Sequence, residues 1–282
     1  MNKRTTVVAV VFASLLTVTL GGIILHQLSG YDYPTSPAFS YEMNVIGDLY
    51  EAFIMVPLGL VGLWAMLRKG SAWGPLIIGG VAGTFAYNYA MVSAGRQNLW
   101  IFLWVLKVAL GGTTVALVWD LLPAGAGTKL KPRIAAAVYF LVVIVAFGKM
   151  MGQRLLASAH GYVMEMTMQA GGAAVDWAEP NLRDPVVFFA MACPMILAAV
   201  TGLWRGTAAG ARAGALTSTF LINMVLMILA TGPVRELLQH GSVSAGMVPM
   251  SVIFIVAAAP AAWLLLSLAK ENPRVGQSRA AA

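Results

Sequence analysis

Three ionisable side chains, Asp48, Glu51 and Lys107, stand inside strongly apolar stretches of the sequence. Asp48 and Glu51 are three residues apart, a spacing that puts both carboxylates on one face of a helix. A charge within the hydrocarbon of a membrane costs about 2.5–3.5 kcal/mol on insertion scales, so it is normally paired or faces water. We therefore expect Glu51 and Lys107 to contact each other, directly or through one water, and to belong to a site for a small polar or anionic solute.

Uncharged polar residues accompany these charges. At 1.5 Å per helical residue, Tyr87, Asn88 and Asn223 fall in the same outer half of the membrane as the charges. Because the polar and charged residues gather in the outer half, the sequence predicts a polar cavity that opens to the outer side. In the alternative, Asn88 and Asn223 only bond a neighbouring helix, and a chain whose polar groups bond only one another would be a membrane scaffold without ligand. The predicted ligand-binding residues are Asp48, Glu51, Tyr87, Asn88, Lys107 and Asn223.

A second set of residues has the softer chemistry of metal ligands. The run HGYVMEMTM at 160–168 contains a histidine and three alternate methionines, and another histidine ends an earlier apolar stretch. Thioethers and imidazole suit Cu(I), and two histidines could hold a haem. Methionine is also a common gap-filler in apolar interiors, and the leading hypothesis needs no cofactor. An alternative function is therefore a copper- or haem-linked membrane subunit, with His26, His160, Met164, Met166 and Met168 as ligands.

Enzyme chemistry finds little support in the sequence. It contains no zinc-protease H-E-x-x-H, no G-x-S-x-G and no P-loop, which are the short motifs that carry a mechanism. The single cysteine cannot form a disulfide within the chain.

The elements that must position these residues follow from composition. With 59% hydrophobic and 10% charged residues, the chain is too apolar for an ordinary soluble domain, in which about a quarter of the residues are charged. A helix crosses the hydrocarbon in about 20 apolar residues. The sequence thus predicts an all-α, polytopic transmembrane helix bundle. Its eight expected helices are 6–27, 44–67, 73–94, 98–122, 133–155, 185–204, 211–232 and 247–269.

The basic residues predict the orientation. Cytoplasmic loops are enriched in Lys and Arg, and twelve of the eighteen basic residues fall on one side if the N-terminus is inside. We expect a multi-pass protein of the bacterial inner membrane with both termini cytoplasmic. The basic cytoplasmic loops then explain the net charge of +7, and no nucleic-acid partner is required. The expected partners are the lipid bilayer and a small polar solute, and a homo-oligomer or a membrane complex stays open. The twelve residues are Lys3, Arg4, Arg68, Lys69, Lys129, Lys131, Arg133, Arg205, Arg212, Lys270, Arg274 and Arg279.

Several residues recur at a nearly constant offset. The stretch GTFAYN at 83–88 reappears as STFLIN at 218–223, with Thr, Phe and Asn in the same spacing. Pro57 and Pro194 are 137 residues apart, and each is followed eleven residues later by an arginine. Self-similarity at one offset indicates an internal duplication.

This duplication predicts two parallel four-helix repeats. Residues 1–125 would form the first repeat, and 126–282 the second repeat with a cytoplasmic C-terminal tail. Because each unit has an even number of helices, both copies insert the same way up, related by a pseudo-twofold axis along the membrane normal.

Three segments carry a family resemblance: GDLYEAFIMVPLGLVGLWAMLRKGS, AYNYAMVSAGRQNLWIFLW and RDPVVFFAMACPMILAAVTGLWRG. They resemble a class of uncharacterised bacterial multi-helix integral membrane proteins, in which an Asp-Leu opens a helix that has a central proline and ends in a basic-Gly turn. The chain departs from that class at Gly47, where the class usually has glutamine. The resemblance implies the eight-span topology and no particular activity.

Overall fold

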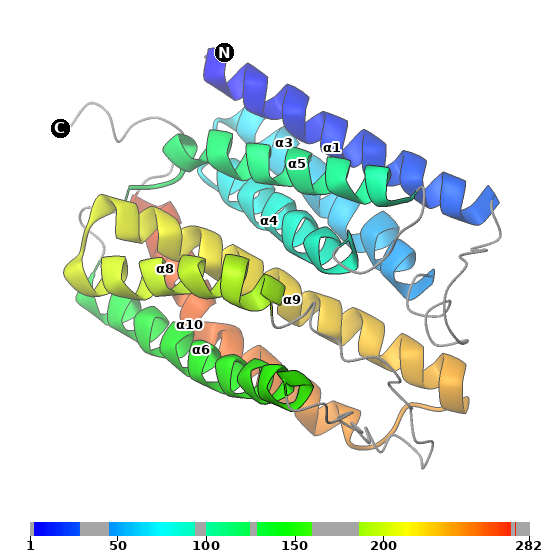
Figure 1. Cartoon of the computed structure of the whole chain (residues 1–282). Coiled ribbons are helices and arrows are strands. Elements are labelled where there is room, and N and C mark those ends of the chain that lie inside the picture. Colours follow the sequence, from blue (N-terminus) through cyan, green and yellow to red (C-terminus); the bar gives the residue numbers. More distant parts are fainter. Residues whose placement is uncertain are drawn as a thin grey trace.

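The computed structural model describes residues 3–28, 45–93, 100–124, 129–159, 186–271 and 274, and every named element among them is helical (Figure 1). This is the predicted class of fold. The elements are α1 (Lys3–Leu28), the wide turn η1 (Glu51–Met55), α3 (Val56–Lys69), α4 (Trp73–Ser93), α5 (Trp100–Val118), the short η2 (Trp119–Leu121), α6 (Leu130–Ala159), the wide turn η3 (Phe188–Ala192), α8 (Cys193–Arg205), α9 (Ala208–His240) and α10 (Met247–Glu271).

Seven helices in the described part of the chain are long and apolar enough to cross a membrane. One of them is the continuous helix Val45–Lys69, which contains η1 and α3. The eighth long helix, α4, is not among the seven. Most of α4 is buried against other helices, so its surface does not have to be compatible with lipid.

The helix α9 is longer than the sequence predicts. It continues past Pro233, which lies inside it, and ends at His240. A proline normally breaks a helix by removing one N–H and crowding the preceding turn. Prolines are nevertheless tolerated within membrane helices, where neighbouring groups satisfy the backbone carbonyl that loses its donor.

The helices pack in two groups of four (Figure 1). In the first group α4 packs against α3 and α5, and α1 packs against α5. In the second, α9 packs against α8 and α10, and α6 packs against α8 and α10. The two groups meet where α4 lies along α9, and a Cβ added at Gly80 would lie 2.6 Å from the Cβ of Thr219. The absent side chain at Gly80 therefore lets the two groups approach closely.

Two wide helical turns occur at the prolines that the sequence singles out. Both η1 and η3 end two residues before a proline, Pro57 and Pro194, and the backbone N–H after each turn donates to a carbonyl five residues earlier. Such π-turns are a known way for a helix to accommodate a local disruption. The two proline helices end alike, at glycines with left-handed backbone, Gly70 (φ 56°) and Gly206 (φ 71°).

Asp120 joins three helices at one end of the bundle. It pairs with Arg4 at the start of α1 and with Arg212 near the start of α9, the latter at 3.4 Å between Oδ1 and Nη1. Several of the basic residues that predict the cytoplasmic side thus lie at one end of the molecule.

Candidate functional site

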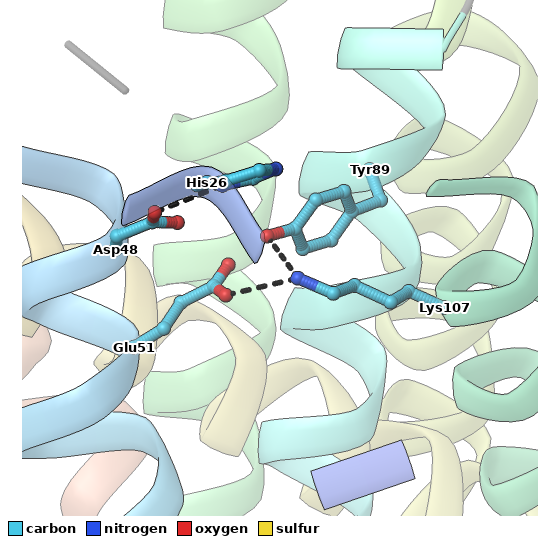
Figure 2. Close-up of polar contacts among 5 residues, drawn as sticks. All are labelled: His26, Asp48, Glu51, Tyr89 and Lys107. Atoms are coloured by element: carbon cyan, nitrogen blue, oxygen red, sulfur yellow. Dashed lines mark hydrogen bonds and ion pairs between the residues drawn. The ribbon is translucent and has the colours of Figure 1, made fainter. Parts of the chain in front are cut away.

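Five buried polar side chains meet at the opposite end of the first helix group (Figure 2). They come from four helices, because His26 ends α1, Asp48 and Glu51 begin the helix Val45–Lys69, Tyr89 lies on α4 and Lys107 lies on α5. Antiparallel neighbours place the end of one helix beside the start of the next, so residues that are distant in sequence share one level of the bundle. We call these five residues the charged cluster.

Lys107 is the centre of the charged cluster. Its side chain is 0% exposed, and its Nζ donates to Glu51 Oε2 at 3.2 Å and to the Tyr89 hydroxyl. The expected contact between Glu51 and Lys107 is therefore present and direct. Gly22 on α1 lies beside Lys107, and a Cβ there would meet its Nζ at an ordinary contact distance of 3.6 Å but would come within 2.8 Å of Cδ2 of Leu103.

Glu51 is the first residue of the wide turn η1. Its carboxylate binds the ammonium of Lys107, which also binds the Tyr89 hydroxyl (Figure 2). The Tyr89 hydroxyl accepts from Lys107 and can donate its own proton to a neighbouring carboxylate. We call Glu51, Tyr89 and Lys107 the triangle, in which one ammonium joins a carboxylate and a phenol.

His26 and Asp48 form a second buried pair in the charged cluster. Nδ1 of His26 lies 2.8 Å from Oδ2 of Asp48, and both side chains are almost completely buried. The contact joins an imidazole nitrogen to a carboxylate oxygen, and Nδ1 is the donor when Asp48 is ionised. Asp48 also interacts electrostatically with Glu51, which lies three residues further along the same helix.

The other predicted site residues lie between the two helix groups. The Tyr87 ring packs edge-on against Phe220 of α9, with 5.2 Å between centroids. The Asn88 side-chain amide donates to the sulfur of Met227 at 3.5 Å, and Asn223 is buried on α9. The structure thus brings Asp48, Glu51 and Lys107 together, whereas Tyr87, Asn88 and Asn223 belong to the α4–α9 interface.

One contact connects the charged cluster to this interface. The Tyr50 hydroxyl donates to the backbone carbonyl of Asn223 at 3.0 Å, and Tyr50 directly precedes Glu51. A shift of α9 relative to the first helix group would therefore act on the backbone that carries Glu51.

Two members of the charged cluster are not among the ligand-binding residues that the sequence predicts. Tyr89 neighbours the predicted Tyr87 and Asn88, and the sequence predicts His26 only as a metal ligand. A signal for His26 was present in the sequence, because it ends one predicted helix and Asp48 begins the next. Consecutive antiparallel helices bring such residues to the same level.

Of the five predicted metal ligands, only His26 lies among the residues that the structure describes. His26 uses Nδ1 for Asp48, and within the described ranges no group of three or more His, Cys, Asp or Glu residues could hold a metal ion. His160, Met164, Met166 and Met168 lie outside the described residues, so a copper or haem site there stays a prediction.

The charged cluster contains groups that can hold an anion and groups that can carry a proton. An ammonium and a phenol hydroxyl are donors to an anion, and two carboxylates and an imidazole are proton acceptors. No family model, no curated protein and no solved structure matches the chain. Its function must therefore be argued from the charged cluster itself.

Proposed function

We propose that this chain is a membrane protein that transports or senses a small polar or anionic solute. The observation that carries the proposal is Lys107, a completely buried lysine whose ammonium is bound by one carboxylate and one phenol. Ionisable residues inside membrane helices normally mark a substrate or ion pathway. A solute anion could take the place of Glu51 at Lys107 and Tyr89.

The competing scaffold hypothesis also has support, because the residues of the charged cluster bond one another. Buried ion pairs are, however, a poor way to stabilise a fold. Replacing such a pair by apolar residues of similar size is often neutral or stabilising. Two adjacent buried pairs in a chain with only 10% charged residues therefore favour a function over a purely structural role.

We also propose that the two helix groups are the two parallel repeats expected from the sequence. The similar packing in each group, the wide turns before Pro57 and Pro194, and the left-handed Gly70 and Gly206 support this. In addition, Thr84 and Thr219, 135 residues apart, each donate a hydroxyl to the carbonyl four residues earlier. The pseudo-twofold axis would then pass between α4 and α9.

The charged cluster would be restricted to the first repeat. At an offset of 137 the residue that corresponds to Glu51 is Phe188, and at 135 the residue that corresponds to Tyr89 is Met224. Both are apolar, so the second repeat cannot reproduce the triangle of carboxylate, phenol and ammonium. We therefore propose one solute site per chain, in the outer half of a bacterial inner membrane, with both termini cytoplasmic.

Ligand-induced stabilisation tests the proposed function. Thermal unfolding of the purified protein would be followed with a panel of small anions and polar solutes: acetate, L-lactate, phosphate, sulfate, glycine and glycerol. A ligand at a hundred times its Kd stabilises the native state by about 2.7 kcal/mol. We expect at least one compound to raise the Tm of the wild type and to leave the Glu51→Leu, Lys107→Leu double variant unchanged. An equal shift in both proteins, or no shift of the wild type, would contradict the proposal.

A further inference from the structure

We infer that the solute is a small monocarboxylate and that it binds together with one proton, which Glu51 receives. This inference rests on the proposed function, since it specifies what the same site binds. Its basis is the geometry of the triangle and the number of charges in the charged cluster.

The triangle already holds a carboxylate. Nζ of Lys107 binds Glu51 at 3.2 Å and also binds the Tyr89 hydroxyl, which points to the same place (Figure 2). Because the two donors are arranged around a carboxylate of the protein itself, the ligand that fits them with the least rearrangement is another carboxylate. Its remaining part must be small, since the Lys107 side chain is completely buried and α1 approaches it at Gly22, where an added Cβ would lie 3.6 Å from Nζ.

The charges of the cluster require a proton to accompany such a ligand. The carboxylates of Asp48 and Glu51 already stand beside the single ammonium of Lys107 and the imidazole of His26. Adding an anion alone would add one uncompensated negative charge in a medium of low dielectric, where unpaired charge is costly. Adding an anion and a proton leaves the net charge unchanged.

Glu51 is the group placed to take this proton. When the solute carboxylate pairs with Lys107, the ion pair between Glu51 and Lys107 breaks and an O–H bond forms on the Glu51 carboxylate. The groups that face Glu51 are Lys107 of α5, Tyr89 of α4, and Asp48 and Tyr50 of its own helix. From α1, His26 is already paired with Asp48. Among the charged residues of the cluster, Glu51 is thus the one that loses its counter-charge when the solute binds.

Proton-linked binding is measurable with the full chain in lipid nanodiscs. Binding of radiolabelled L-lactate and pyruvate would be titrated in weakly buffered medium while an indicator dye reports pH. We expect the wild type to take up about one proton per carboxylate bound, and its Kd to rise about tenfold for each unit of increasing pH. Glu51→Gln resembles protonated Glu51, so it should bind the carboxylate without proton uptake and with a Kd independent of pH. Glu236→Gln, which changes a carboxylate bonded to Ser244 outside the cluster, should behave as the wild type.

The outcomes separate the inference from the proposed function. If neither carboxylate binds although phosphate, sulfate or glycine stabilises the wild type, the inference is wrong and the proposed function stands. Carboxylate binding without proton uptake, or equal uptake by Glu51→Gln, would also overturn the inference alone. If no compound of the panel binds the wild type, both fail.

Discussion

The Tyr50 hydroxyl donates to the backbone carbonyl of Asn223 across the junction of the two helix groups, at 3.0 Å. The two residues are 173 positions apart in sequence, and Tyr50 is adjacent to Glu51 of the charged cluster. The second helix group, which contributes no residue to the charged cluster, is therefore bonded to the helix turn that presents Glu51.

Removing this hydroxyl should weaken the junction. We expect Tyr50→Phe to lower the free energy of unfolding by about 0.5–1.5 kcal/mol, the usual net value of one hydrogen bond. Chemical or thermal unfolding of the purified protein measures this difference in the free energy of unfolding. Tyr139→Phe, on α6, is the matched control and should change stability less. Equal losses in the two variants would show that the bond to Asn223 contributes nothing particular.

The contact between Glu51 and Lys107 predicts strongly non-additive mutations. Either Glu51→Leu or Lys107→Leu leaves its partner buried without its counter-charge, which costs about 3–5 kcal/mol. The double variant replaces both charges by apolar side chains and should be nearly as stable as the wild type. A melting series on the two singles and the double measures the coupling; additive losses would contradict direct pairing.

Much of the fold could be predicted from the sequence because the membrane imposes simple rules. A span needs about 20 apolar residues, and this criterion locates the helices to within a few residues at most of their ends. One exception is α9, which continues through Pro233 to His240.

The charged cluster was predictable in part. The pairing of Glu51 with Lys107 follows from the cost of an isolated charge in the membrane interior. The choice of Tyr89 over Tyr87 does not follow, because residues two apart on a helix point in very different directions and only packing sets the rotation of α4. The wide turn η1 adds a further shift of the helix face at Glu51, which a regular 3.6-residue period cannot reveal.

Close packing of α1 against α5 depends on Gly22. A Cβ at Gly22 would lie 2.8 Å from Cδ2 of Leu103, whereas a Cβ at Gly21 would meet nothing within 4 Å. We expect Gly22→Val to destabilise the protein by about 1–3 kcal/mol through overpacking. Gly21→Val carries the same change in helix propensity and should be nearly neutral. The melting temperatures of the two variants test this prediction. An equal decrease in both variants would mean that α1 can move away from α5.

The proposed orientation can be tested by cysteine labelling. In a Cys193→Ser background, single cysteines would replace Ser71, Thr207 and Ser242, which lie in the connections after α3, α8 and α9. Because basic residues cluster near the first two positions and positive loops stay inside, Ser71→Cys and Thr207→Cys should be shielded from a membrane-impermeant thiol reagent in intact cells. Ser242→Cys should react, and all three should react after permeabilisation. The reverse pattern would place both termini outside the cell and turn the charged cluster toward the cytoplasm, so that the solute would have to reach Lys107 from within.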